Sequence, residues 1–302
     1  MAVQKQIWLS TIVEGLFASN SFLSKAFNAD EYVNSGKTVH IPNAGKASNV
    51  KKNRTEFPAK VNTREDKDLT FNLDEFTTDP ILISHADTVE LSYDKRESVL
   101  RNDKLKLQDS VALDFIKNWS PSGKSVIKTT GKAQAAHTSK SATGMRKGFT
   151  KKDVLSAMVE FNASNIPQEG RYMLLDALMH AQLLNDLTEA EGNAFLASAD
   201  AQNGIVGKLY GFNIMMRSKA ALYDDKGEPK HWNDPASATD CAAALAWHEQ
   251  SVCRALGEVK MFEGENDPTY YGDIYSFLLR AGGRPMREDV AGLIAIVQDQ
   301  SA

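Results

Sequence analysis

Few of the histidines, acids and nucleophiles in this chain have the spacing that catalysis or metal binding requires. His85 precedes Asp87 by two residues, so the carboxylate could orient the imidazole as a general base. A structural histidine at the entrance of a helix is the simpler interpretation of this pair. His231 and Trp232 could line a pocket, but surface or interface packing is again the simpler interpretation. The other histidines are scattered without metal-ligand spacing, so we expect no metal site.

Two Gly-Lys-[Ser/Thr] triplets resemble the end of a phosphate-binding loop, but both lack its first glycine. The pattern GxxxxGK needs that glycine because backbone amides must surround a phosphate. Asn118 takes its place before Gly123, and Glu31 takes it before Gly36. The chain also lacks GxGxxG, HExxH and GxSxG motifs. We therefore expect no cofactor and no catalytic residue, although an active site dispersed over the sequence would leave no such motif.

The composition is that of an ordinary globular protein. Of the 302 residues, 42% are hydrophobic and 25% are charged, which suffices for one large domain or two smaller ones. No apolar run is long enough to span a bilayer, and the start MAVQKQIWLS lacks a secretory signal, so we expect a cytosolic protein without membrane contact. The two cysteines, Cys241 and Cys253, form neither a disulfide framework nor a CxxC motif.

Positive and negative charges are separated along the chain, whose formal net charge is −4. Residues 1–152 contain 24 Lys and Arg against 17 Asp and Glu, whereas residues 153–302 contain 11 against 22. The positive excess lies at residues 37–60 and 124–152. Such a chain can bind nucleic acid through its basic part, or another copy of itself through complementary faces. Solvated basic loops without a partner are the alternative.

The elements that position these groups follow from hydrophobic periodicity. Apolar residues at helical spacing predict a short helix at residues 4–17. Alternating residues predict two strands, at 38–42 and 68–73, on either side of a polar and basic tip. This long hairpin has too little apolar surface to fold on itself, so we expect it to pack on something else.

The most regular helix is predicted at about residues 88–119, after a short buried strand at 80–84. Leu107, Val111 and Phe115 lie on one apolar stripe, whereas Lys104 lies on the charged face. At about 1.5 Å per residue the helix would be a rod about 40 Å long. We interpret it as a structural spine.

The remaining chain mixes strands and helices without regular alternation, which predicts an α+β fold. We interpret residues 121–150 as a mobile basic loop with one strand near 125–129, and residues 224–240 as a second loop. Helices are predicted at 151–161, 176–184 and 188–196, with a short helical stretch at 249–256. Strands are predicted at 172–175, 241–247, 273–279 and 292–297, and a pair of strands at 204–216.

Four short motifs occur in an order typical of one protein family. They are YDKR at residues 93–96, PQEGRY at 167–172, GIVGKLYGF at 204–212, and a closing segment from YGD at 271–273 through GGRP at 282–285. Over about residues 35–298 the chain resembles the major capsid proteins of tailed bacteriophages, which have the HK97 fold. The resemblance is greatest to the podovirus type, such as that of phage T7.

The resemblance implies a division of the chain into the parts of that fold. Residues 1–35 would be an N-terminal arm, and residues 36–76 would be the E-loop, which reaches over a neighbouring subunit. The peripheral or P-domain would take residues 77–154, including the spine helix and the basic loop, and the C-terminal strands at 257–302. The axial or A-domain would take residues 155–256.

The resemblance also implies a function, partners and a location. Such proteins are not enzymes; they assemble as hexamers and pentamers into a procapsid, and the icosahedral shell matures as it encloses double-stranded DNA. A separate scaffolding protein, a portal protein and a decoration protein would be partners, and packaged DNA would be contacted non-specifically. The protein would assemble in the cytoplasm of the bacterial host and end in the virion capsid.

The hairpin and the basic loop provide candidate contact residues. Candidates for contact between subunits are Lys46, Lys51, Lys52, Arg54, Phe57, Lys60 and Phe71. Candidates for weak contact with DNA or with another subunit are Lys124, Lys128, Lys132, Lys140, Arg146 and Lys147. We hypothesise that the basic hairpin tip docks on an acidic surface within residues 224–274 of the adjacent subunit, while Phe57 and Phe71 supply apolar adhesion.

Two other functions are compatible with the sequence. A cytosolic α+β enzyme with a dispersed active site would leave the basic hairpin without a role. Another virion structural protein, such as a decoration or tail protein, would not need the long spine helix. A dedicated nucleic-acid-binding module is disfavoured, because the basic segments contain almost no aromatic residues on which bases could stack.

Overall fold

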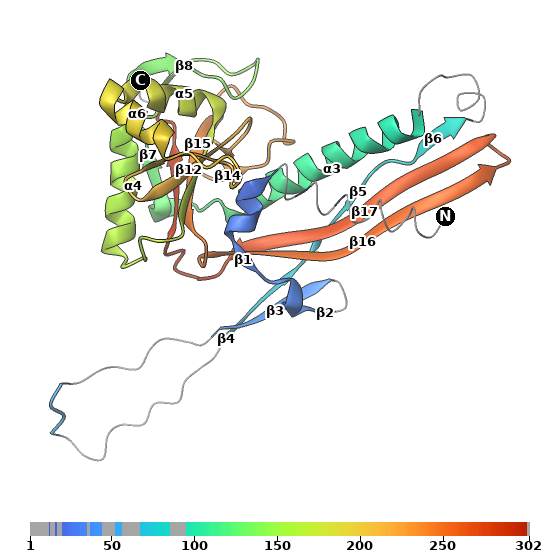
Figure 1. Ribbon diagram of the computed structural model, residues 1–302, viewed down its shortest axis with the longest axis horizontal. Coiled ribbons are helices and arrows are strands. Elements are labelled where there is room, and N and C mark those ends of the chain that lie inside the picture. The colour runs from blue at the N-terminus through green and yellow to red at the C-terminus, as the bar shows by residue number, and fades with distance from the viewer. Residues whose placement is uncertain are drawn as a thin grey trace.

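The computed structural model describes residues 20–34, 37–43, 52–55, 67–84 and 95–300, together with Ile12 and Leu16. Figure 1 shows a body of strands and helices, from which a long helix and a long two-stranded hairpin extend to one side. The described residues form two large sheets and two small ones. Most of the helix predicted at 4–17, and the pair of His85 and Asp87, lie outside the described residues.

The body is built on an eight-stranded sheet. Its strands follow the order β11, β12, β10, β15, β13, β14, with β18 on the opposite side of β15 and β7 beside β18. Their bounds are Ile205–Leu209 (β11), Phe212–Arg217 (β12), Arg171–Asp176 (β10), Cys241–His248 (β15), Ala221–Tyr223 (β13), Pro229–Lys230 (β14), Leu293–Val297 (β18) and Val126–Lys128 (β7).

Three helices cover one face of this sheet: α4 (Lys151–Ala163), α5 (Ala177–Asp186) and α6 (Glu189–Ala197). Their positions, and those of β10, β11, β12 and β15, confirm the sequence-based predictions to within a few residues. Polar side chains fix where the helices begin. Asp176 caps α5 by accepting a hydrogen bond from the Met179 amide, and Thr188 and Glu191 form a capping box at the start of α6.

The strand β15 separates two hydrophobic cores. All of its residues are buried, and its sequence CAAALAWH is the continuous apolar run typical of a strand that is covered on both faces. The odd-numbered residues from 241 to 247 face a core that they share with the long helix α3 (Lys95–Trp119). The even-numbered residues from 242 to 246 face the core under α4, α5 and α6. One strand therefore supports both cores.

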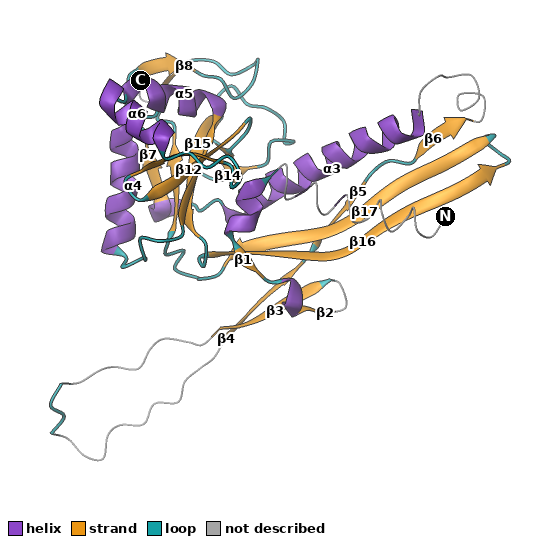
Figure 2. Ribbon diagram, in the orientation of Figure 1, coloured by secondary structure: helices purple, strands orange, loops and turns teal. Residues whose placement is uncertain are grey.

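The long hairpin consists of β16 (Val252–Asp267) and β17 (Gly272–Pro285). The short strand β1 (Phe27–Asn28) pairs with β16, and β5 (Asp74–Thr77) and β6 (Ile81–Ser84) pair with β17. Figure 2 shows α3 running along this five-stranded sheet. Its apolar stripe is confirmed, because Leu107, Val111 and Phe115 are all buried. Lys104, which we expected on the charged face, is only 6% exposed.

The structure corrects three predictions about the C-terminal half. Residues 249–256 are not helical, since β16 begins at Val252 and pairing with β17 buries Val252 and Ala255. The strand predicted at 273–279 runs on to Pro285. The C-terminal strand β18 lies beside β15 in the eight-stranded sheet rather than with the other strands of residues 257–302.

Residues 121–150 form a folded segment rather than a mobile loop. The segment contains β7, which pairs with β18, and a small hairpin of β8 (Ala133–Ala135) and β9 (Met145–Lys147). Phe149 is 1% exposed and packs in the core under α4, α5 and α6. We call residues 121–150 the basic segment.

The predicted basic hairpin is present at its base. The strands β3 (Thr38–Asn43) and β4 (Lys67–Asn72) pair along their full length, and β2 (Val33–Asn34) adds to β3. A small core of its own lies at this base. It contains Val39, Ile41 and Phe71 together with Cys253 and Ala255 of β16.

An aromatic junction holds the two large sheets together. Phe22 is 2% exposed, and its ring packs edge-on against Trp119 of α3 and Trp247 of β15, with centroid distances of 5.9 and 6.4 Å. The indole N–H groups donate to the carbonyl oxygens of Cys253 and Lys25, respectively. The segment at residues 20–28 therefore crosses the junction and is bound on both sides.

Candidate inter-subunit surfaces

The structure divides the candidate residues of the hairpin. Lys52 is exposed and Arg54 is half-buried, and both lie in the short described part of the tip. Phe71 is 9% exposed and packs in the core at the base of the hairpin, so it stabilises this chain and is not free for adhesion to a neighbour. The remaining four candidates lie outside the described residues: Lys46, Lys51, Phe57 and Lys60. Docking of the tip on a neighbour stays a prediction.

The candidates in the basic segment also separate into two groups. Arg146 is buried, and its guanidinium donates to the carbonyl oxygens of Met145 and Ala238, so it braces the fold. Lys147 forms an ion pair with Asp299, with 2.7 Å between Nζ and Oδ2. The other four lysines are exposed: Lys124, Lys128, Lys132 and Lys140.

Polar contacts attach the basic segment to the helices. The buried carboxylate of Asp153, in the first turn of α4, accepts hydrogen bonds from the amide and hydroxyl groups of both Thr130 and Thr150. Burial raises the pKa of Asp153, and these four hydrogen bonds oppose the rise. Gln182 of α5 donates to Gln134 and accepts from the Phe149 amide. The segment is thereby fixed at several points along its length.

A further contact joins the tip of the β8–β9 hairpin to the sheet. The ring nitrogen Nε2 of His137 lies 2.8 Å from Oδ2 of Asp176, the residue that caps α5. Asp176 is 3% exposed, so this interaction is largely shielded from water. The tip of the basic segment is held above the start of α5.

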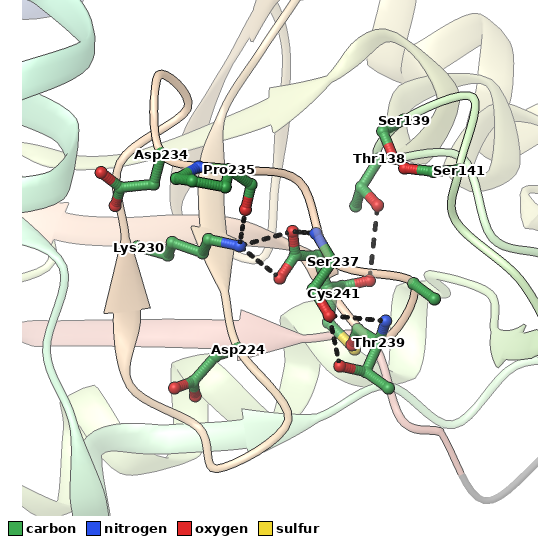
Figure 3. A network of polar contacts seen from close by, with 12 residues as sticks. Thr138, Ser139, Ser141, Asp224, Lys230, Asp234, Pro235, Ser237, Thr239 and Cys241 are labelled. Carbon is green, nitrogen blue, oxygen red and sulfur yellow. Dashed lines mark hydrogen bonds and ion pairs between the residues drawn. The ribbon is translucent and has the colours of Figure 1, made fainter.

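A network around Asp240 fixes the predicted loop at residues 224–240 (Figure 3). Nζ of Lys230 lies 2.8 and 2.9 Å from the two carboxylate oxygens of Asp240 and 2.7 Å from the Pro235 carbonyl oxygen. The Ser237 amide donates to the same carboxylate, which is almost completely buried. Thr138 of the basic segment donates to the Asp240 carbonyl oxygen, so the loop and the basic segment brace each other.

The acids expected to form one surface within residues 224–274 lie mainly in two places, with Glu249 and Glu258 outside both. The loop at 224–240 adjoins the body, whereas residues 263–273 lie at the far end of the β16–β17 hairpin (Figure 1). In the loop, Asp240 is neutralised by Lys230. Asp225, Glu228 and Asp234 of the loop are exposed, and at the far end Glu265 is exposed and Asp267 is half-buried.

The far end of the β16–β17 hairpin also displays aromatic side chains that sequence reasoning missed. Tyr270 is 56% exposed, Tyr271 is 78% exposed, and Phe262 nearby is 51% exposed. The turn that carries the tyrosines is well defined, since Asp267 accepts hydrogen bonds from the backbone amides of Thr269 and Tyr271. The signal in the sequence was a Tyr-Tyr pair inside a polar turn, which is rare in a solvated loop.

The geometry gives little support to a pocket or a metal site formed by the histidines. The Trp232 indole donates to the Ala220 carbonyl oxygen and stacks with the Lys219 ammonium, so the pair at 231 and 232 packs against the body. Burial lowers the pKa of His180 and of His248. Within the described ranges, no cluster of three or more His, Cys, Asp or Glu side chains could hold a metal ion. No helix of that part of the chain is long and apolar enough to cross a membrane.

Solved structures of capsids contain similar folds. The chain aligns with one from the capsid of cyanophage P-SCSP1u at a TM-score of 0.62 and 18% identity, covering 90% of this chain and 86% of that one. For the capsid of Ralstonia phage GP4, the TM-score is 0.62 at 13% identity, with coverages of 92% and 88%. For a virus-like particle from Pyrococcus furiosus, it is 0.57 at 10% identity, with coverages of 97% and 99%.

These similarities define the fold. No protein-family model matches the chain, and neither does any curated protein. At such low identities the alignment concerns architecture, and it extends over about nine-tenths of each chain. The α+β, HK97-like fold expected from the sequence is therefore confirmed.

Proposed function

We propose that this chain is a major capsid protein, which associates with copies of itself as hexamers and pentamers into the icosahedral shell around a phage double-stranded DNA genome. The observation that carries the proposal is the architecture shared with chains of capsids over about nine-tenths of the sequence. The direction in which α3 and the β16–β17 hairpin extend away from the body also supports it, because such projections gain packing partners in an assembly.

In this proposal the parts of the chain take the roles of the HK97 fold. Residues 36–76 are the E-loop, α3 is the spine helix, and α3 and the β16–β17 hairpin belong to the P-domain. The eight-stranded sheet with α4, α5 and α6 is the A-domain, and it includes β18. The protein is a structural component of the virion, made in the bacterial cytoplasm, with a separate scaffold, a portal protein, a decoration protein and the packaged DNA as partners.

The E-loop tip is proposed to contact the far end of the β16–β17 hairpin of a neighbouring subunit. At the tip Lys52 is exposed and Arg54 is half-buried, and the hairpin end offers acids beside the exposed Tyr270 and Tyr271. Individual exposed ion pairs contribute only about 0–1 kcal/mol, so the charges set register and association rate. The tyrosine rings provide apolar area and favourable stacking for an arginine side chain.

Negative-stain electron microscopy of the purified chain, combined with sedimentation velocity, tests the proposed function. We expect shells, tubes, or rings of five and six subunits, either from the chain alone or after co-expression with its scaffolding protein. A chain that stays monomeric at high concentration and also in the presence of the scaffold contradicts the proposal.

A further inference from the structure

The two ends of helix α4 adjoin segments of opposite charge. The first turn of α4 is bonded to the basic segment through Asp153, and β8 lies beyond this end of the helix (Figure 1). The last turn leads into the turn at residues 164–170. Thirteen residues at about 1.5 Å each separate the two ends by about 20 Å. The helix therefore marks two distinct flanks of the body.

The basic flank consists of Lys128, Lys132 and Lys140. All three side chains are exposed, and within the described ranges none of them forms an ion pair. No acidic residue occurs between 121 and 152, and the acids Asp186 and Glu191 beside the start of α4 are bonded to Lys151. The hydrogen bonds of Thr130 and His137 hold the backbone that carries these lysines, so their positions are defined. An exposed Met145 in β9 adds apolar surface to the same flank.

The acidic flank consists of Glu160, Glu169 and Glu249. Glu160 lies in the last turn of α4 and Glu169 in the following turn, and the Glu249 amide donates to the Gly170 carbonyl oxygen. All three side chains are exposed and, in the part of the chain that is described, none has a basic ion-pair partner.

The arginines near the acidic flank do not neutralise it. Arg171 follows the turn directly, but its side chain is 1% exposed and points into the body. Arg287 is already paired with Asp289, in a turn that adjoins the same region through the hydrogen bond from the His248 amide to the Gly292 carbonyl oxygen. The carboxylates of the acidic flank can therefore pair with basic groups of another molecule.

We propose that the basic flank of one copy docks on the acidic flank of a second copy, head to tail. The inference rests on the proposed function, because it assigns a contact within the ring of a capsomer. When each copy uses its two flanks on two different neighbours, the contact is head to tail and can repeat around a closed ring. The charges are complementary, so they would steer association and fix its register. In such a ring the lysines of each copy and the carboxylates of each copy all gain partners of opposite charge.

A second copy fits these flanks better than DNA does. A nucleic acid would occupy the lysines and leave the carboxylates of the acidic flank without a partner. The basic flank also presents no aromatic side chain for base stacking, and the chain as a whole is acidic. Binding of DNA to the basic flank is therefore the result that the experiment must separate from self-association.

Charge reversal of each flank tests the inference. One variant carries Lys128→Glu, Lys132→Glu and Lys140→Glu; the other carries Glu160→Lys, Glu169→Lys and Glu249→Lys. The matched control reverses three exposed lysines outside both flanks: Lys106→Glu, Lys117→Glu and Lys208→Glu. Circular dichroism and thermal melting establish that each variant is folded. Sedimentation velocity and electron microscopy then measure rings and shells.

Each flank variant alone is expected to associate about 100-fold more weakly than the unmodified chain, since three favourable contacts become repulsive. The control should associate normally. A chain with both flanks reversed should recover, because its charges are complementary again. A mixture of the two flank variants should form rings only with an even number of subunits, since the copies must alternate; six-membered rings return and five-membered rings do not.

Three results overturn the inference. They are normal association of either flank variant, failure of the doubly reversed chain to recover, and a loss of DNA binding by the lysine variant without any loss of self-association. The proposed function is judged separately, by whether the unmodified chain forms shells. Shells from both the unmodified chain and the flank variants would refute the flank contact and leave the capsid function intact.

Discussion

Arg171 should be one of the residues on which the stability of the body depends most. It is 1% exposed, and in the described chain no carboxylate lies within ion-pair distance of it. Its guanidinium instead donates to the Pro167 carbonyl oxygen at 2.7 Å, the Ile166 carbonyl oxygen at 2.5 Å and Oδ1 of Asn162 at 2.9 Å. Burial lowers the pKa of Arg171. The side chain therefore closes the turn at residues 164–170 through hydrogen bonds rather than through an ion pair.

The change Arg171→Met keeps the apolar stem and removes all three donors. Each hydrogen bond to a charged group contributes about 1.5–3 kcal/mol, and each buried acceptor left alone costs about 1–3 kcal/mol. Relief of the desolvated charge offsets part of the loss, so we expect a net destabilisation of about 3 kcal/mol. In a chain of this size that should lower the melting temperature by about 5 °C.

The comparison with Arg171→Lys separates charge from geometry. A lysine keeps the positive charge but lacks the planar fork, and it loses the stacking of the guanidinium over the Phe161 and Phe212 rings at 5.4 and 6.0 Å. It should destabilise the chain at least as much as methionine does. Urea unfolding followed by far-ultraviolet circular dichroism measures all three proteins. A lysine variant within about 0.5 kcal/mol of the unmodified chain would refute this reasoning, because charge alone would then suffice.

Three further predictions concern assembly, the loop network and pH. The hairpin-tip variant Lys51→Glu, Lys52→Glu, Arg54→Glu should form far fewer particles in electron microscopy while melting at the normal temperature; normal particles would show that the tip does not dock by charge. Asp240→Ala leaves the Lys230 ammonium without its carboxylate partner and should lower the free energy of unfolding, measured with urea, by about 3–5 kcal/mol. The change Asp225→Ala, at an exposed residue, serves as the control. The Glu191 carboxyl accepts hydrogen bonds from the Lys151 ammonium, which lowers its pKa to about 2. Its interaction is thus present above the ordinary pKa of 4.5 and is lost as the pH falls through 2, and an NMR titration of a Lys151→Ala variant should show that pKa moving back toward 4.5.

The elements that could be predicted are those in which the spacing of apolar residues along the sequence matches the residues that are buried in the structure. The apolar stripe of α3 and the continuous apolar run of β15 each follow from a single stretch of sequence. The short helix predicted at residues 249–256 was wrong because the apolar residues there fit a helix as well as a strand. Only pairing with the distant strand β17 decides between the two. The position of β18 beside β15 likewise depends on a long-range pairing that no local pattern records.

The sequence predicted which charged residues belong to the candidate surfaces, but it did not predict which of them are buried or what they contact. The basic segment was found from its charge, but the contacts that fold it join residues far apart in the sequence, such as Thr130 with Asp153. Charge alone also could not show that Arg146 is buried, because a guanidinium that donates to backbone carbonyl oxygens has no signature in the sequence. Phe71 was assigned to an interface since its strand looked too short of apolar neighbours, and Cys253 and Ala255 supply them from β16.

The aromatic junction gives the protein an intrinsic optical reporter. Trp119 and Trp247 are both fully buried, with ring centroids 5.9 Å apart, and they lie where the long helix meets the eight-stranded sheet. Their fluorescence emission and near-ultraviolet circular dichroism depend on how the two indoles pack against each other and against Phe22. Any rotation of one sheet relative to the other would change that signal. A movement of the two sheets relative to each other can thus be followed in real time, without an attached dye.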